Sequence, residues 1–220
     1  MDVNEILANI EKFNRLCQEK NATLVLASKM VPKETLFEVA SLYGGSLIFG
    51  ENKAQEFTEK YFEADNLSWH FIGRLQTNKV KYLVGKVKMI QSVDSERLLD
   101  EISRLSVKKG VVTDYLLEIN LGLEESKGGF SPSDFERVLD LVKDKEGVRL
   151  RGIMSVLPIG AGVPPLMKKA KELSDTLVKR YGEIANTISI GMSEDYLACL
   201  ENSSNMIRLG TAIFGKRSYQ

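Results

Sequence analysis

Short apolar runs alternate with longer amphipathic stretches along the whole 220-residue chain. We count eight runs of the strand type, in which β-branched and other apolar residues follow one another with few charges. They are "TLVLAS" (23–28), "LIFGE" (47–51), "SWHFIG" (68–73), "MIQSV" (89–93), "YLLEIN" (115–120), "RLRGIMSV" (149–156), "TISIGM" (187–192) and "MIRLG" (206–210). Strands separated by helices of roughly 10 to 15 residues pair in parallel through right-handed crossovers. Eight such units predict an α/β fold, a single (β/α)8 TIM-type barrel over residues 1–220.

The stretches between the runs carry helix signals of their own. Over residues 131–147 we expect Ser131 to cap a helix, Pro132 to occupy its first position and Gly147 to end it. Apolar residues repeat at helical spacing over 95–110 as well, and an additional helix over 3–18 precedes the first strand. The apolar face of this additional helix comprises Ile6, Leu7, Ile10, Phe13 and Cys17. We expect it to cover the outside or the bottom of the barrel.

Composition narrows the class of protein. Thirty basic residues balance 30 acidic ones, so no net field attracts nucleic acid or an anionic membrane. No stretch approaches the roughly 18 to 20 apolar residues of a membrane span, and the N-terminus lacks the features of a signal peptide. Cys17 and Cys199 lie far apart in helix-like segments, which favours two reduced thiols. We therefore expect a soluble, cytoplasmic protein.

The residues that follow the seventh and eighth strands are typical of a phosphate site. In barrels of this kind the functional site lies at the C-terminal ends of the strands, and a phosphate commonly binds after strands seven and eight. Gly191 and Gly210 allow close backbone approach, and Ser193 and Thr211 supply hydroxyl groups at the start of the following helices. Each hydroxyl could instead be a plain helix N-cap.

Two cationic side chains lie near this predicted cradle. Lys29 ends the first strand, where a charge beside a buried strand costs free energy unless it is paired, solvated or chemically consumed. Desolvation near Arg208 favours the neutral amine, a nucleophile able to form a Schiff base with a carbonyl. The alternatives are an ion pair of Lys29 with a carboxylate such as Glu51, and of Arg208 with a barrel carboxylate.

A phosphate cradle and an activated lysine together suggest a phosphorylated aldehyde. Pyridoxal 5′-phosphate (PLP) fits both ends, with its aldehyde on the lysine and its ring nitrogen facing a charged group. His70 is the only histidine, which excludes histidine triads and multi-histidine metal sites and leaves His70 itself as a hydrogen-bonded structural residue. No glycine-rich nucleotide-binding motif follows the first strand.

The sequence also resembles the pyridoxal-phosphate homeostasis protein family, whose fold is similar to the barrel domain of alanine racemase. The segments that carry the resemblance are "ASKMVP", "FGENKAQE", "WHFIGRLQTNK" and "ISIGMSEDYLACLENSSNMIRLGTAIFG", in the family's order along nearly the whole chain. The departures are Met30-Val31 after the lysine and Arg74 after Gly73, where the family often has proline. Neither removes a predicted ligand.

The resemblance implies a role for individual residues. Lys29 would hold PLP as a Schiff base, and Arg208 would face the pyridine nitrogen. Ser193, Gly210 and Thr211 would bind the phosphate. Asn52 would lie near the cofactor. An arginine opposite the ring nitrogen keeps that nitrogen unprotonated, which weakens the ring as an electron sink and disfavours a transaminase.

Two functions remain in view from the sequence. The resemblance implies a non-enzymatic protein that holds PLP for intracellular vitamin B6 homeostasis, with PLP-dependent apo-enzymes as candidate recipients. The alternative is a PLP-dependent amino-acid racemase, which needs a second acid/base group opposite Lys29. Tyr196 and Tyr219 are the tyrosines nearest the cradle in sequence, and we expect both to be packing residues. A Schiff-base aldolase is weaker, because the sixth strand has no lysine.

The sequence also contains two Gly- or Pro-rich loops, over 121–131 and 157–165, which follow the fifth and sixth strands. They either form a rim around the site or are ordinary surface connections. A barrel mouth without a covering domain favours a monomer.

Overall fold

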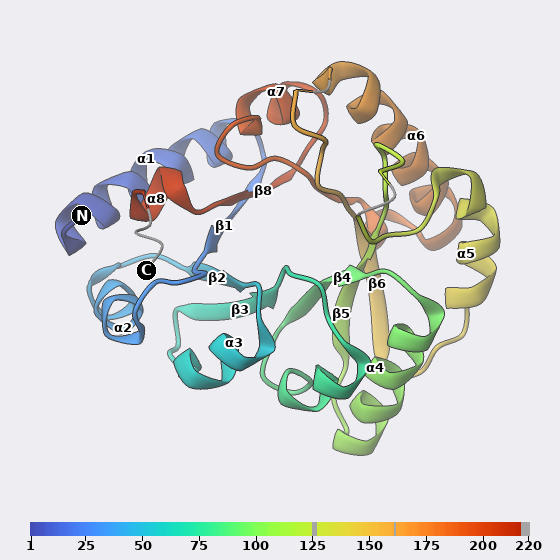
Figure 1. Ribbon diagram of the computed structural model, residues 1–220, viewed down its shortest axis with the longest axis horizontal. Coiled ribbons are helices and arrows are strands. Elements are labelled where there is room, and N and C mark those ends of the chain that lie inside the picture. Colours follow the sequence, from blue (N-terminus) through green and yellow to red (C-terminus); the bar gives the residue numbers. More distant parts are fainter. Residues whose placement is uncertain (125–126, 161, 217–220) are drawn as a thin grey trace.

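The computed structural model describes residues 1–124, 127–160 and 162–216, and its strands form a closed parallel barrel (Figure 1). The strands pair in chain order, and β1 also pairs with β8. They are β1 (Thr23–Ala27), β2 (Leu47–Glu51), β3 (Leu67–Phe71), β4 (Met89–Val93), β5 (Thr113–Glu118), β6 (Val148–Met154), β7 (Thr187–Ser189) and β8 (Met206–Leu209). Each of the eight predicted runs overlaps one of these strands, so the (β/α)8 prediction is confirmed.

The helices surround the barrel (Figure 1). They are α1 (Val3–Glu19), α2 (Lys33–Leu42), α3 (Ala54–Lys60), α4 (Glu96–Lys109), α5 (Phe135–Val142), α6 (Val163–Tyr181), α7 (Tyr196–Glu201) and α8 (Thr211–Phe214). The described residues also form the 3-10 helices η1 (Thr77–Tyr82), η2 (Pro132–Asp134) and η3 (Glu183–Ala185). The connection from β3 to β4 carries only η1, so the strand-helix alternation is less regular than the sequence suggested.

The additional N-terminal helix α1 lies outside the barrel, next to β1 and α8 (Figure 1). Asp2 and Glu5 form a reciprocal capping box at its start. Its predicted apolar face is buried, except that Leu7 is only partly buried. The Asn9 side-chain amide donates to the backbone oxygen of Ile213 at 3.1 Å. Because α8 has only four residues, α1 supplies much of the outer layer over β1 and β8.

Two predicted helices have different outcomes. Helix α4 begins at Glu96, and Gly110 ends it in the left-handed conformation, as expected. Over 131–147 the expected single helix is wrong in its length. Ser131 accepts a hydrogen bond from the N–H of Ser133, but a 3-10 turn comes first, and α5 ends at Val142 rather than near Gly147. The extended backbone of Lys143 stops the helix there.

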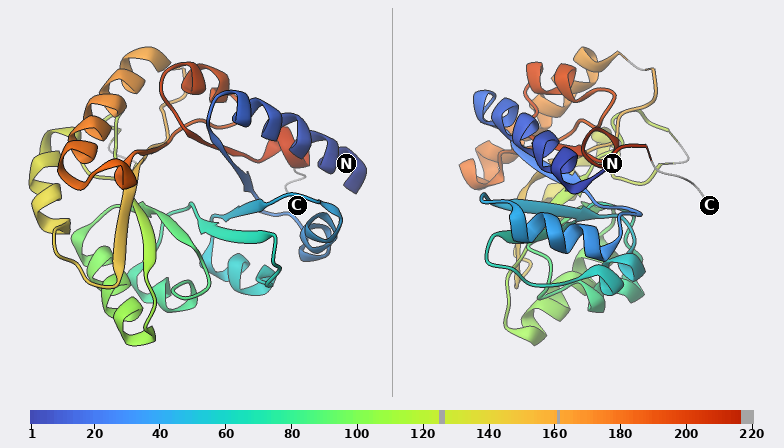
Figure 2. Two further views of the ribbon diagram at one scale, coloured as in Figure 1. Left: turned by 180° about the vertical axis from the view of Figure 1, so that it is seen from behind. Right: turned by 90° about the vertical axis from the view of Figure 1, so that its left-hand side faces the viewer.

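Residues of β1 and β8 alternate between the two faces of the barrel wall. Leu24 and Leu26 belong to the large core beneath the helices, whereas Val25 belongs to a small separate apolar cluster. Arg208 on β8 is in register with Val25, which places it on the same, inner face. Figure 2 shows the loops after β5 and β6 projecting from one side of the barrel. Residues 125, 126 and 161 of the two predicted rim loops lie outside the described residues.

Candidate functional site

A pocket of about 630 Å³ lies at the barrel mouth, where β1, β2, β7 and β8 end. Its lining includes the six residues to which the family resemblance assigns a role: Lys29, Asn52, Ser193, Arg208, Gly210 and Thr211. Apolar residues lie among these polar ones, namely Ala27, Ile72, Val156, Leu157, Pro158, Ile159, Val163 and Met192. The volume is in the range of small-molecule pockets, about 300 to 1,000 Å³. The pocket therefore combines a few polar groups with an apolar wall.

Lys29 lies two residues beyond the end of β1 and is half-buried. The alternative in which it pairs with Glu51 is wrong. The Glu51 carboxylate instead accepts hydrogen bonds from Lys60 Nζ at 3.0 Å and from the backbone N–H of Asn52 at 2.8 Å. Within the described residues, no hydrogen bond or ion pair involves the Lys29 amine. Lys29 therefore lines the pocket, and its amine has no ion-pair partner among the described residues.

Asn52 enters the pocket because β2 and β3 end close together. A Cβ atom at Gly73 would lie only 2.1 Å from the backbone oxygen of Asn52, so only glycine allows this approach. Arg74 is exposed, as a solvated surface arginine would be. It lines a second, neighbouring cleft of about 860 Å³ together with Lys53 and Lys79, and Asn52 lines both hollows.

Arg208 is fixed from the inside of the barrel. Its side chain donates to the backbone oxygen of Ser189 at 2.5 Å, to Ser189 Oγ at 2.8 Å and to the backbone oxygen of Ser155 at 2.9 Å. Burial lowers the pKa of the guanidinium to about 10, which leaves it charged near neutral pH. The alternative ion pair with a barrel carboxylate is absent among the described residues. Arg208 therefore brings a fixed positive charge to the pocket, and the nearby Glu118 and Asp195 carboxylates favour its charged form.

A chain of neutral groups supports Arg208 from the barrel interior. Ser189 Oγ donates to Gln91 Oε1 at 2.7 Å, and Gln91 Nε2 lies 2.9 Å from His70 Nδ1. Burial, with a smaller contribution from the Lys88 charge, lowers the pKa of His70 to about 3. His70 is therefore neutral near pH 7. It is a hydrogen-bonded structural histidine, as expected.

The predicted phosphate cradle is made of loop ends rather than capped helices. Ser193 Oγ accepts a hydrogen bond from the N–H of Ala212 at 3.3 Å, which joins the ends of β7 and β8. The capping alternatives are wrong, because Asp195 and Gly210 are the N-cap residues of α7 and α8. Both helices are short, so their dipoles add little to anion binding. The donors that this part of the pocket offers to an anion are therefore hydroxyl and backbone N–H groups.

Gly191 does not line the pocket, contrary to our expectation. Its φ angle is +119°, and a Cβ atom would lie 3.1 Å from both Cys199 and Ile207. The glycine is therefore needed for the backbone path and its packing. Tyr196 is a packing residue as predicted, because its ring makes an edge contact with Phe13 of α1 at 5.4 Å between centroids. Tyr219 lies outside the described residues.

The two rim loops touch each other beside the pocket. The Lys127 amine, in the loop after β5, donates to the backbone oxygen of Leu157 at 3.2 Å. Residues 157–160 and Val163 line the pocket, so the loop after β6 forms part of its wall. Its exposed member Ile159 is 95% accessible. This loop is therefore more than a surface connection.

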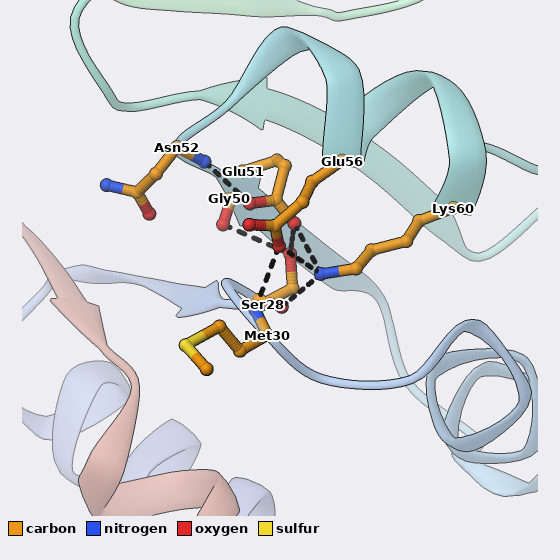
Figure 3. Close-up of polar contacts among 7 residues, drawn as sticks. All are labelled: Ser28, Met30, Gly50, Glu51, Asn52, Glu56 and Lys60. Atoms are coloured by element: carbon orange, nitrogen blue, oxygen red, sulfur yellow. Dashed lines mark hydrogen bonds and ion pairs between the residues drawn. The ribbon is translucent and has the colours of Figure 1, made fainter. Parts of the chain in front are cut away.

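Sequence reasoning missed the residues that support the site. Ser155 and Ser189 hold Arg208, and Lys60 and Glu56 hold the loop around Lys29 (Figure 3). Glu56 and Lys60 are four residues apart on a helix, a spacing that usually indicates a solvated surface pair. The useful signal was Glu51, a carboxylate at the end of a buried strand, which requires a buried donor.

Several other predictions concern the rest of the chain. Cys17 and Cys199 are buried free thiols, and burial raises their pKa values to about 11 and about 12. No cluster of His, Cys, Asp or Glu suited to a metal ion occurs in the described ranges. None of the described helices combines the length and apolar character that a membrane crossing requires.

Comparison with known proteins agrees with this geometry. The family described as "Alanine racemase, N-terminal domain" matches residues 1–218. The Pyridoxal phosphate homeostasis protein of Aquifex aeolicus is 39% identical over 220 residues, covering 96% of each chain. The chain belongs to the pyridoxal phosphate homeostasis protein family.

Solved structures extend the comparison. PipY of Synechococcus elongatus, solved without PLP, is 27% identical with a TM-score of 0.87 over 96% of this chain and 100% of that one. The same protein solved with PLP bound is 25% identical, with a TM-score of 0.79 over the same shares. A Clostridium difficile alanine racemase is 17% identical with a TM-score of 0.75. The match covers 100% of the chain described here but only 57% of the alanine racemase chain.

Proposed function

We propose that this protein holds pyridoxal 5′-phosphate reversibly as a Schiff base on Lys29 and acts in PLP homeostasis. The observation that supports this most strongly is that all six residues to which the family resemblance assigns a role line one pocket. The names of the relatives and the PLP-bound PipY structure support the same ligand.

The donor set suits the chemical parts of PLP. An amine at the end of β1 suits the aldehyde, and the apolar residues of the pocket wall suit the two faces of an aromatic ring. Ser193, Gly210 and Thr211, at the ends of β7 and β8, offer hydroxyl and backbone donors to the phosphate. When bound, PLP supplies an aldehyde that condenses with an amine and a ring that withdraws electrons.

Lys29 has the reacting role in this proposal. With PLP bound, Lys29 would supply the amine that condenses with the aldehyde, and the condensation would release one water molecule. Arg208 would act through its charge, because a fixed guanidinium near the ring nitrogen would disfavour protonation of that nitrogen. The ring is then a weak electron sink, which suits storage of the cofactor better than carbanion chemistry.

The racemase alternative requires a second acid/base group opposite Lys29. Among the described residues that line the pocket there is neither a tyrosine nor a histidine. The test is exchange of the α-proton of L-alanine in deuterated buffer. We expect the purified protein loaded with PLP to exchange it no faster than free PLP does. Exchange well above that rate would favour the racemase.

Binding itself is tested by titrating the purified protein with PLP and following the visible absorption. We expect a Schiff-base band that saturates at one PLP per chain for the wild type and is absent in Lys29→Ala. Absence of the band in the wild type would mean that the pocket serves another ligand.

The partners and the oligomeric state are part of the same proposal. The protein acts as a monomer and delivers PLP to apo-enzymes, and the open rim around Ile159 supports access from solvent. Light scattering of the loaded protein and reactivation of a PLP-dependent apo-enzyme test the two statements. A stable dimer, or reactivation no faster than by an equal concentration of free PLP, would contradict them.

A further inference from the structure

Lys60, the last residue of α3, is a buried lysine beside the proposed site (Figure 3). Its amine donates to three oxygens: the Ser28 backbone oxygen at 2.9 Å, Glu51 Oε2 at 3.0 Å and Glu56 Oε2 at 2.7 Å. An ammonium group has three N–H donors, so each has an acceptor. Lys60, Glu51 and Glu56 are called the Lys60 network below.

The Lys60 network holds the backbone on both sides of Lys29. On one side, Lys60 donates to the Ser28 carbonyl oxygen, and Ser28 Oγ donates to Glu51 Oε2 at 3.0 Å. On the other side, the N–H of Met30 donates to Glu56 Oε2 at 2.9 Å. Lys29 is therefore the one residue between two charge-assisted contacts, which are stronger than neutral hydrogen bonds.

The conformation of Met30 shows that this loop needs such a restraint. Its φ angle is +61°, in the left-handed region that a methionine rarely adopts. A residue keeps such a conformation only where surrounding contacts over-determine it. The acceptor that Glu56 provides to the Met30 N–H is such a contact.

The charge state of Glu56 suits this task. Burial raises the pKa of Glu56, but the hydrogen bonds from Lys60 and Met30 outweigh it, so the net pKa is lowered. The carboxylate is therefore ionised near neutral pH and accepts from both donors. The Lys53 charge also favours the ionised form.

The same network also reaches the second strand end. Glu51 Oε1 accepts a hydrogen bond from the backbone N–H of Asn52 at 2.8 Å. Lys29 and Asn52, which line the pocket from β1 and β2, are therefore tied to one buried carboxylate cluster. An ammonium with three oxygen acceptors has no lone pair, so Lys60 itself does not compete for the aldehyde.

We propose that Lys60 and Glu56 are positioning residues that fix the backbone around Lys29, so that its amine meets the aldehyde of PLP in a reactive geometry. This inference rests on the proposed function, because it assigns a cause to the reactivity of the same lysine. Displacing a reacting group by about 1 Å can lower the reaction rate by about 100-fold. The Lys60 network should thus control formation of the Schiff base and leave non-covalent binding unchanged.

The test compares Glu56→Ala with the control Glu59→Ala. Glu59 is an exposed acidic residue on the same helix. Two probes separate the steps: PLP, whose Schiff base is followed by stopped-flow absorption, and pyridoxamine 5′-phosphate, which has no aldehyde. We expect Glu56→Ala to slow Schiff-base formation about tenfold or more and to change the analogue's Kd less than about twofold. Glu59→Ala should change neither, and Glu56→Gln, which keeps an acceptor oxygen, should recover most of the rate.

Schiff-base formation at the wild-type rate in folded Glu56→Ala would overturn the proposal. So would a loss of pyridoxamine 5′-phosphate affinity as large as the loss of rate with PLP, because that result indicates general damage to the pocket. Hydrogen exchange of the Met30 amide gives a cofactor-free readout, and we expect faster exchange in Glu56→Ala and in Lys60→Met than in the wild type. Equal exchange would also contradict it. If wild-type Lys29 forms no Schiff base, the proposed function fails, while the exchange result still decides whether the Lys60 network holds the loop.

Discussion

The two sides of the pocket are built by different means. On the β1–β2 side, charged side chains from α3 and from the end of β2 hold the backbone around Lys29 and Asn52. On the β7–β8 side, Arg208 is held by carbonyl and hydroxyl groups, and Ser193 joins two loop ends through one backbone N–H. In the proposed function, the first side places one reacting atom, whereas the second offers several donors to an anion. Rigid charge networks suit the first task, and backbone and hydroxyl donors suit the second.

The largest expected effect comes from breaking the charged side. Lys60→Met leaves the fully buried Glu51 carboxylate without its cation, and removing one partner of a buried pair costs about 3 to 5 kcal/mol. We expect a loss of about 3 kcal/mol in the free energy of unfolding, measured by urea denaturation. Lys171→Met is the matched control. It removes an exposed ion pair with Asp175 on α6 and should cost under about 1 kcal/mol. Equal losses in the two variants would contradict the comparison.

As the pH falls, the hydrogen-bonded groups behind Arg208, which include His70, should lose their contribution to stability at a higher pH than the Lys60 network does. The pKa of His70 is about 3 in the folded chain and 6.5 in the unfolded chain. Between these two pH values the imidazole is protonated in the unfolded chain but not in the folded chain. Its stabilising contribution is complete above pH 6.5 and is lost as the pH falls. We expect a loss of about 2 kcal/mol between pH 6.5 and 4.5.

Glu56 provides the contrast. Its lowered pKa gives a contribution that is present above its ordinary value of 4.5 and disappears only as the pH falls below it. Urea denaturation at several pH values checks both windows. His70→Gln should flatten the slope between pH 6.5 and 4.5, and Glu56→Gln should flatten it only at lower pH. An unchanged slope in His70→Gln would show that His70 is not the titrating group.

Ser193→Ala should have a smaller effect, confined to the β7–β8 side. It removes the hydroxyl that accepts from Ala212 and that we propose as a phosphate donor. Loss of one such hydrogen bond costs about 1 kcal/mol, or about fivefold in Kd. Calorimetry should show weaker binding of pyridoxamine 5′-phosphate, while the intrinsic rate of Schiff-base formation at saturating PLP stays unchanged. A slower rate at saturation would mean that the two sides are not independent.

The smallest effect concerns the strain beside Lys29. Glycine adopts the left-handed region without the steric penalty that Met30 bears at φ +61°. Met30 is exposed, so little buried area is lost. We expect Met30→Gly to change the free energy of unfolding by less than about 1 kcal/mol, in the stabilising direction. Thermal denaturation measures this, and a clear loss of stability would show that the conformation is not strained.

The two sides also differ in how much the sequence predicted. Lys29, Ser193, Gly210 and Thr211 follow strand ends, and the barrel topology alone brings strand ends together. The Lys60 network was not predictable in the same way. Whether a helical lysine turns toward a strand end or toward solvent depends on how α3 packs, and the spacing of Glu56 and Lys60 is the same in both cases.

The central claim is that Lys29 is the lysine that carries PLP. The most direct measurement is borohydride reduction of the PLP-loaded protein, followed by peptide mass mapping of every modified lysine. We predict one pyridoxyl group per chain on the peptide that contains Lys29, and no modification of Lys60. Reduction mainly at another lysine, or the same yield of modified protein from Lys29→Ala, would contradict the account.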